Sequence, residues 1–424
     1  MGFRIENAGL ILPGRRVATG DVVVENGLVA AIEERPCDPV RLVMPGLVNC
    51  HGHTAMTLVR GVGGGLPLQR WLEEAIFPIE AKMTPGHIRA GALWGALEML
   101  AGGTTSVADM YDFPEEGAKA FVEAGIRSRV CRVGLNFIPG RLEDCIAFTR
   151  SFNSSRLAHQ APGTRHQAPG TTLADLCIHS EYLTDEAFCR ALAEANRELK
   201  RPVHLHVSET EKEHRECLAR HGKTPIAYLS DTGFLDHGGY AAHCVWCTDD
   251  DFRIMAEKGV SLVHNPTSNM KLGSGFARVP RAVELGVNVA LGTDGCASND
   301  NLDMFEEMHL ASLIHKGLAK DPTVLSAWDV IEMATVNGAK ALGLGRTGEL
   351  REGWAADLCV VDLKRPHLVP ALDLPNLIVH SMQASDVEMT VVGGEVVYER
   401  GRWPRVDAAR AESDLRRAVR ELTK

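Results

Sequence analysis

The chain has 424 residues, of which 45% are hydrophobic and 24% charged, and its formal net charge is −10. Such values are typical of a globular protein with a large core. The acidic balance and the lack of a Lys/Arg cluster argue against a nucleic-acid partner, and no apolar run approaches the length of a membrane span. No apolar signal core follows Met1, and the eleven scattered cysteines lack the pattern of a disulfide framework, so we expect a cytoplasmic protein.

Short β-type segments come first along the chain, at residues 9–12, 21–25 and 29–33. Eight short apolar runs follow, at residues 42–50, 105–109, 129–133, 173–179, 203–207, 240–243, 260–264 and 287–294. Segments with helical periodicity lie between them, for example residues 91–100, 115–124, 185–199 and 249–258. Eight strands that alternate with helices predict an α/β fold, a closed (β/α)8 (TIM) barrel.

The last part of the chain returns to β-type segments, at residues 358–362, 389–392 and 395–398. Gly393-Gly394 between the last two predicts a hairpin. We therefore expect a small β sandwich built from both termini, residues 1–44 and 346–403. The barrel would occupy residues 45–345, and an amphipathic C-terminal helix would lie within residues 404–424.

The sequence HQAPGT occurs twice, at residues 159–164 and 166–171. The Pro/Gly-rich composition predicts a loop just before the fourth strand. Its two histidines have no further ligand-type spacing around them, so we interpret the repeat as an expanded surface loop, whose role the sequence does not give.

Side chains with metal-ligand or acid–base chemistry stand where the predicted strands end. In a barrel these ends form the face that carries the active site. Because residues two apart on a strand point the same way, the two histidines of His-Gly-His can reach one metal. A histidine and a carboxylate from other strands would complete a site suited to Zn²⁺, with Fe²⁺ or Mn²⁺ also possible. The residues are His51, His53, His179, His204, His206, Glu209, His243, His264 and Asp294.

Each of these signals alone has a simpler interpretation. A single His-x-His usually satisfies backbone groups, and Thr-Asp-Gly is more often a turn. Cys244-x-x-Cys247 lacks the second pair of a zinc ribbon and the fold of a redox motif, so we interpret both thiols as packing residues. The order of the whole set along the chain favours a metal site.

The motifs resemble the amidohydrolase superfamily. They are Pro45-Gly-Leu-Val-Asn-Cys-His51-Gly-His53, His204-Leu-His206-Val-Ser-Glu209, Ala242-His243-Cys244, His264-Asn-Pro-Thr-Ser-Asn269 and Gly292-Thr-Asp294-Gly. The match runs in order over nearly the whole chain and is most similar to the S-adenosylhomocysteine and 5'-methylthioadenosine deaminases. The resemblance implies a (β/α)8 barrel with a split β sandwich. It is compatible with a homo-oligomer, for which no sequence feature identifies an interface.

The resemblance also implies the metal site. His51, His53, His206 and Asp294 match the metal ligands. Dinuclear relatives carry a bridging lysine where this chain has His179, so one divalent metal per subunit is implied, with Zn²⁺ favoured.

The resemblance implies catalytic and substrate-binding roles as well. Glu209 matches the acid that protonates the ring nitrogen, and His243 matches the residue that helps to orient or deprotonate the metal-bound water. In the mechanism that we expect, His243 and Asp294 take the proton of that water. His179 matches a substrate-binding histidine, and Glu80 the carboxylate for the ribose hydroxyls. Arg141 matches an arginine for the carboxylate tail of a homocysteine group, although the flanking sequence departs from the family pattern. The composition of residues 61–83, with Trp71, predicts a flap over the pocket.

The predicted function is hydrolytic deamination of an adenine nucleoside, namely S-adenosylhomocysteine, 5'-methylthioadenosine or adenosine, to the inosyl product and ammonia. A deaminase of a free base such as guanine, cytosine or an 8-oxopurine, or a triazine hydrolase, could use the same metal set. Glu80 discriminates between them, because a free base has no ribose. A binding protein on a silent barrel would be expected to have lost a metal or acid residue, and none is missing.

Overall fold

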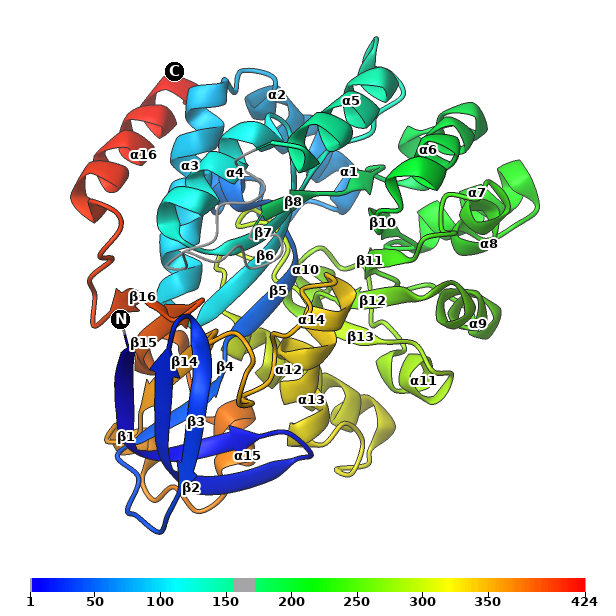
Figure 1. The fold of residues 1–424 in the computed structure, drawn as a ribbon. Helices are drawn as coiled ribbons and strands as arrows, with labels where there is room; N and C mark the ends of the chain where they lie inside the picture. The colour runs from blue at the N-terminus through cyan, green and yellow to red at the C-terminus, as the bar shows by residue number, and fades with distance from the viewer. Residues whose placement is uncertain (1, 156–171, 424) are drawn as a thin grey trace.

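The structure is a computed structural model that describes residues 2–155 and 172–423 (Figure 1). Its parallel strands form two sheets, with the orders β5-β6-β7-β8 and β13-β12-β11-β10-β9. These strands are β5 (Leu47–Gly52), β6 (Thr104–Tyr111), β7 (Arg127–Arg132), β8 (Thr172–Ala174), β9 (Leu176–Cys177), β10 (Val203–Val207), β11 (Gly239–His243), β12 (Val260–His264) and β13 (Val289–Leu291).

Backbone hydrogen bonds connect the two parallel sheets at both of their edges. Asp175, between β8 and β9, donates its N–H to Val130 O of β7 over 3.0 Å, and Asp294 N donates to His51 O of β5 over 3.0 Å. The predicted parallel α/β architecture is confirmed. A fully closed eight-stranded barrel stays a prediction, because the ladders form two sheets.

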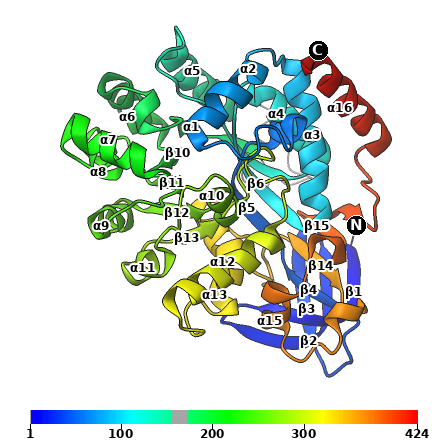
Figure 2. The same cartoon turned by 180° about the vertical axis from the view of Figure 1, so that it is seen from behind.

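Most of the helices lie on the outer side of the parallel strands (Figures 1 and 2). The helices are α1 (Leu68–Arg70), α2 (Phe77–Glu80), α3 (Pro85–Ala101), α4 (Pro114–Ala124), α5 (Arg141–Asn153), α6 (Glu186–Leu199), α7 (Glu211–His221), α8 (Pro225–Asp231), α9 (Asp249–Lys258), α10 (Pro266–Lys271), α11 (Val279–Glu284), α12 (Met304–Ala319), α13 (Ala327–Ala334), α14 (Val336–Ala341), α15 (Leu374–His380) and α16 (Ala408–Leu422). Because helices cover the strands, β10, β11 and β12 are buried along their whole length, as in parallel sheets generally. Among the described residues, no helix is long and apolar enough to span a membrane.

Strands from both ends of the chain form one further sheet, with the order β16-β15-β14-β4-β1-β2-β3. The two ends meet where β14 pairs antiparallel with β4. The strands are β1 (Gly2–Leu12), β2 (Arg16–Glu25), β3 (Leu28–Glu34), β4 (Arg41–Pro45), β14 (Leu358–Asp362), β15 (Val387–Val392) and β16 (Glu395–Glu399). The glycine hairpin between β15 and β16 is confirmed. The predicted two-layer sandwich is not confirmed, because all seven strands share one hydrogen-bonded sheet.

Two predicted strands are interrupted in the structure. The run at residues 42–50 is divided between β4 in the terminal sheet and β5 in the parallel sheet. Gly46 lies at the division, where a Cβ would come within 2.2 Å of the Thr105 side chain, so only glycine fits. The run at residues 173–179 is divided at Asp175, whose buried carboxylate accepts hydrogen bonds from Arg201 and Tyr240. Apolar periodicity does not reveal either break.

Candidate active site

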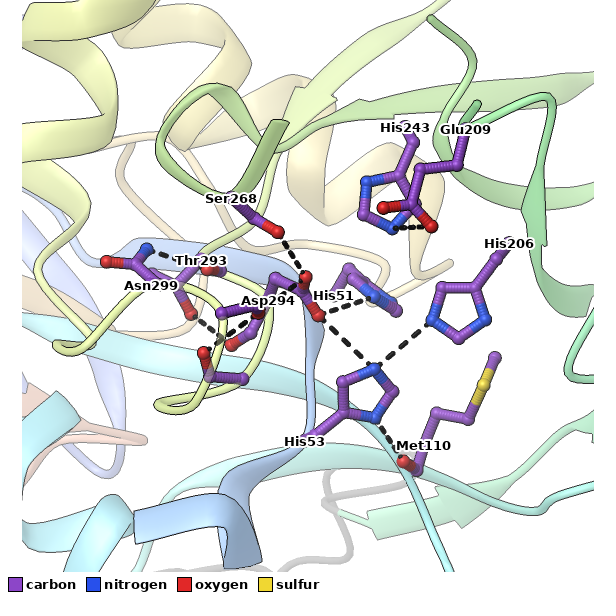
Figure 3. A network of polar contacts seen from close by, with 12 residues as sticks. His51, His53, Met110, His206, Glu209, His243, Ser268, Thr293, Asp294 and Asn299 are labelled. Atoms are coloured by element: carbon purple, nitrogen blue, oxygen red, sulfur yellow. Dashed lines mark hydrogen bonds and ion pairs between the residues drawn. The ribbon is translucent and has the colours of Figure 1, made fainter. Parts of the chain in front are cut away.

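The four predicted metal ligands meet at the carboxyl ends of the parallel strands (Figure 3). His51 lies in β5, His53 follows that strand, His206 lies in β10 and Asp294 follows β13. Each side chain offers one ligand atom, and these atoms all lie within 4.8 Å of one another. His53 Nε2 lies 3.2 Å from both His206 Nε2 and Asp294 Oδ1.

Hydrogen bonds to the backbone fix the tautomers of two of these histidines. His53 Nδ1 lies 2.6 Å from Met110 O, and His206 Nδ1 lies 2.7 Å from His179 O. Since a carbonyl oxygen can only accept, both Nδ1 atoms carry the ring proton. The Nε2 atoms of His53 and His206 are thereby left as lone-pair donors that face the same point.

This point suits a cation. Lone pairs on His53 Nε2 and His206 Nε2 repel at 3.2 Å unless a positive charge lies between them. His51 Nε2 is buried without a hydrogen-bond partner, 3.2 Å from Asp294 Oδ1. Burial lowers the pKa of His53, but the hydrogen bond and charge of Asp294 outweigh it and raise the pKa to about 9, so without a metal a proton would occupy Nε2 at the place where the ion would bind. Imidazole nitrogens with one carboxylate oxygen are ligands that zinc accepts, so the residues fit a divalent metal.

Two serines determine which oxygen of Asp294 faces the cluster. Ser268 Oγ donates to Asp294 Oδ2 over 2.6 Å, and Ser298 Oγ donates to the same atom over 2.8 Å. Oδ1 therefore remains available beside His51 and His53. Burial alone would raise the pKa of Asp294, but those two histidines outweigh it and hold the pKa well below its ordinary value. The backbone of Asp294 has a φ of 62°, a strained conformation of the kind that clusters at functional sites.

His204 contacts His51, the remaining histidine of the predicted ligand set. His51 Nδ1 lies 2.8 Å from His204 Nε2, and His204 Nδ1 lies 3.7 Å from Cys131 Sγ. Burial lowers the pKa of His204 well below its ordinary value, so its ring is neutral. If His51 Nδ1 donates to His204 Nε2, His51 Nε2 faces the cluster with a lone pair, as the other two histidines do.

We expect His204→Leu to weaken metal binding by about 10–100-fold, because it removes the acceptor that orients His51. His204→Gln is the matched control, since its amide oxygen can still accept from His51 Nδ1. Competition with a chromophoric chelator measures both affinities. Equal metal affinity in the two variants would contradict the orienting role.

Glu209 and His243 lie beside the metal ligands. Glu209 Oε2 is 3.8 Å from His243 Nε2, and Ser274 Oγ donates to Glu209 Oε1 over 3.3 Å. His243 Nδ1 lies 2.9 Å from Asn269 Oδ1, which leaves Nε2 toward Glu209 if the amide oxygen is the acceptor. Burial raises the pKa of Glu209, which favours its protonated form and suits a proton donor.

The backbone that carries Glu209 is held by Glu213. The two carboxylate oxygens of Glu213 accept from Ser208 N over 2.9 Å and from Glu209 N over 2.8 Å. Burial and the charge of Glu209 raise the pKa of Glu213 to about 7, against the effect of those two hydrogen bonds. Glu213 is therefore a positioning residue at the turn between β10 and α7.

The raised pKa of Glu213 predicts a pH dependence of stability. Between its unfolded pKa of about 4.5 and its folded pKa of about 7, the folded state binds more protons. Stability should therefore fall as pH rises through this window, by roughly 1–3 kcal/mol, and then level off. Glu213→Gln lacks this titration, so its melting temperature relative to the unchanged protein should rise from pH 4.5 to 7. Parallel melting profiles would contradict the shift.

A pocket with about 940 Å³ of empty space, part of it open to solvent, leads to the metal ligands. Glu80, His179 and Trp71 all line it, and their contacts with a substrate stay predictions. Tyr111 OH donates to Glu80 Oε1 over 2.5 Å, and burial raises the pKa of Glu80. Burial and neighbouring histidine charges lower the pKa of His179 to about 3, so it is neutral. Trp71 is buried in a π-helical turn and donates to Val62 O over 3.2 Å.

Two residues that the sequence points to lie elsewhere. Arg141 does not line the pocket; its guanidinium pairs with Asp112 over 2.5 Å. His264 ends β12, but its ring is buried away from the pocket, 5.3 Å from the ring of His315. The repeat at residues 159–171 lies outside the described residues. Cys244 and Cys247 are buried free thiols, as packing residues would be.

Comparisons with known proteins place the chain in a family. The model of the amidohydrolase family matches residues 42–397. The chain belongs to the amidohydrolase family. A 5-methylthioadenosine/S-adenosylhomocysteine deaminase of Acetivibrio thermocellus is 42% identical to this amidohydrolase over 388 residues, 91% of this chain and 86% of the relative.

Two further proteins are similar over nearly all of this amidohydrolase. A 5'-deoxyadenosine deaminase of Methanosarcina mazei is 41% identical over 420 residues, 96% of this chain and 94% of the relative. The crystal structure of an adenosine deaminase from Xanthomonas campestris with bound zinc superposes with a TM-score of 0.90 at 30% identity and covers 98% of both chains.

Several groups at the site of this amidohydrolase escaped the sequence reasoning. Ser298, Tyr111 and Glu213 act on Asp294, Glu80 and Glu209 through contacts between separate elements or within a tight turn. Ser268 lies inside the motif His264-Asn-Pro-Thr-Ser-Asn269, so the motif itself could have pointed to this serine as a site residue. Glu213 follows the helix cap Thr210 by three residues, which the sequence offers only as a capping pattern.

Proposed function

We propose that the protein is a hydrolytic deaminase of adenine nucleosides that uses one divalent metal, with Zn²⁺ favoured. The observation that carries this proposal is the convergence of His53 Nε2, His206 Nε2 and Asp294 Oδ1 on one point, with the protonatable Glu209 beside it. Relatives 41–42% identical over more than nine tenths of the chain are deaminases of 5'-modified adenosines, which supports the substrate class.

The residues have complementary tasks in such a reaction. A divalent ion held by His51, His53, His206 and Asp294 would supply activated water at neutral pH. Glu209 would protonate the ring nitrogen next to the amino-bearing carbon and so draw electron density from it. His243 Nε2, together with Asp294, would accept the proton that the attacking water loses. Collapse of the tetrahedral adduct would return a proton to the amino group and release ammonia.

The ribose would lie against Glu80, at the end of the pocket near Tyr111. Tyr111 donates to one carboxylate oxygen, and this leaves the other for a ribose hydroxyl. Glu80→Ala should lower kcat/KM for a nucleoside by about 10–100-fold, mainly through KM, because a hydrogen bond to a charged group is lost.

Glu74→Ala is the matched control for the ribose contact. Glu74 lies on the same segment, is half exposed and pairs with Arg70 at the surface. It should keep the nucleoside kinetics of the unchanged protein. An unchanged KM in Glu80→Ala, measured by ammonia release, would remove the ribose contact from the proposal.

Hydrolysis itself can be tested with water labelled with heavy oxygen. The inosyl product of 5'-deoxyadenosine should carry one labelled oxygen, and ammonia should appear in equal amount. Mass spectrometry and an ammonia assay give both readouts. An unlabelled product, or product without ammonia, would contradict hydrolytic deamination.

The domain organisation that we propose is the one predicted from the sequence. The two parallel sheets act as one (β/α)8 barrel of residues 45–345, and residues 1–44 and 346–403 act as a companion β domain. The C-terminal helix, α16 (Ala408–Leu422), lies within residues 404–424. Eleven free cysteines suit a reducing compartment, which supports a cytoplasmic location.

A further inference from the structure

An ion pair lies at the edge of the pocket, next to the residues proposed to hold the ribose. Arg141 begins α5, and Asp112 directly follows β6. Arg141 Nη1 donates to Asp112 Oδ1 over 2.5 Å and to Val133 O over 3.3 Å. The Arg141 side chain is 10% exposed and the Asp112 side chain 43%, so the guanidinium is the more enclosed partner.

The two charges have different access to the pocket. Asp112 and Val133 both line it, whereas Arg141, which hydrogen-bonds to both, does not. In the part of the chain that the structure describes, no Lys or Arg lines the pocket. The lining also includes the apolar side chains of Phe113, which follows Asp112, and Leu135, which lies two residues after Val133. The carboxylate of Asp112 is therefore the charge that a ligand meets at this edge.

Asp112 also lies on the ribose side of the pocket. It follows Tyr111, the donor to Glu80, and its charge adds to the burial that raises the pKa of Glu80. A 5' substituent of a nucleoside leaves the ribose and would extend toward this edge. Relatives of both kinds, with and without S-adenosylhomocysteine in their names, are 41–42% identical, so overall similarity does not decide which substituent is accepted.

We propose that Asp112 is a specificity-determining residue, which holds Arg141 away from the substrate and disfavours nucleosides whose 5' substituent carries a carboxylate. The inference rests on the proposed function. Uncharged substituents, such as 5'-deoxy and 5'-methylthio groups, meet apolar side chains at this edge, and their exclusion from water favours binding. A homocysteine group also brings a carboxylate, which finds no free Lys or Arg in the described lining because Asp112 engages Arg141, and an unpaired carboxylate is costly to desolvate.

A different arrangement of the same pair would give the opposite preference. If the pair opened, Asp112 could bind the ammonium and Arg141 the carboxylate of the homocysteine group. The second hydrogen bond of Arg141, to Val133 O, and the burial of its side chain oppose such opening. The two arrangements predict opposite effects of neutralising Asp112.

The test compares kcat/KM for S-adenosylhomocysteine with kcat/KM for 5'-methylthioadenosine. Asp112→Asn should raise this ratio by about tenfold, since it frees the guanidinium of Arg141 to pair with the substrate carboxylate. The double variant Asp112→Asn/Arg141→Gln should return the ratio to that of the unchanged protein. Asp144→Asn is the control, because Asp144 is half exposed on α5 and pairs with Arg132; its ratio should not change.

The outcomes separate this inference from the proposed function. A ratio that falls in Asp112→Asn would establish the open arrangement and overturn the proposal, and an unchanged ratio would overturn it as well. A rise that persists in the double variant would exclude Arg141 as the acquired carboxylate site and also overturn it. In all three cases 5'-methylthioadenosine would still be deaminated. If no nucleoside were deaminated by any variant, the proposed function itself would fail.

Discussion

Glu209→Gln is expected to lower kcat by about 10²–10⁴-fold while the protein keeps its metal. The amide has nearly the shape of the acid and can still accept from Ser274 Oγ, which lies 3.3 Å from Glu209 Oε1. It cannot transfer a proton to a ring nitrogen. Burial raises the pKa of Glu209 and so favours the protonated form that makes the transfer. The loss of activity should therefore appear in kcat rather than in KM.

Glu211→Gln is the matched control for this prediction. Glu211 begins α7, its side chain is 45% exposed, and it pairs with Arg215. Steady-state kinetics and elemental analysis would be measured for both variants. A Glu209→Gln enzyme with nearly full kcat would contradict a role of Glu209 in the proton transfer. A Glu209→Gln enzyme that has lost its metal would contradict the prediction that the variant keeps the ion.

His206→Ala is expected to abolish turnover and to lower the metal content well below one ion per chain. The Nε2 lone pairs of His206 and His53 face each other over 3.2 Å, so the alanine removes one side of the cation site. Without the ion, water is no longer activated at neutral pH. Enzymes typically accelerate reactions by about 10⁶–10¹⁷-fold, and we expect the variant to lose at least about four orders of magnitude of this acceleration.

His237→Ala controls for the general loss of a histidine. His237 is exposed and lies between α8 and β11, outside the pocket lining. Metal content by elemental analysis and ammonia release would be compared, with circular dichroism to confirm that both variants fold. Full metal content in His206→Ala would show that the ion is held elsewhere.

The order of strands and helices could be predicted from the sequence, because fully buried parallel strands are continuous apolar runs and the covering helices have their own period. The breaks at Gly46 and Asp175 could not. Each depends on a contact with a distant element, Thr105 in one case and Arg201 and Tyr240 in the other. The same limit applies to β4 and β14, which pair although they lie more than 300 residues apart, and the apolar pattern also leaves the layering of the terminal strands open.

The candidate site was predictable as a set of side chains but not as a geometry. His51, His53, His206 and Asp294 were identified because they stand at strand ends, and the structure brings them together. The choice of Asp294 Oδ1 over Oδ2 depends on Ser268 and Ser298, which no spacing rule connects to it. Likewise, the sequence offered Arg141 as a substrate contact, and only the structure reveals Asp112 as its partner.

The most direct test of a metal-dependent nucleoside deaminase is ammonia release by zinc-loaded protein. 5'-Deoxyadenosine, 5'-methylthioadenosine, S-adenosylhomocysteine and adenosine would be compared with guanine, cytosine and a chlorotriazine. We predict turnover of the nucleosides, with 5'-deoxyadenosine and 5'-methylthioadenosine ahead of S-adenosylhomocysteine, and its loss when a chelator removes the metal. Turnover of only the free bases or the triazine would contradict the nucleoside assignment, and undiminished turnover after chelation would contradict the metal site.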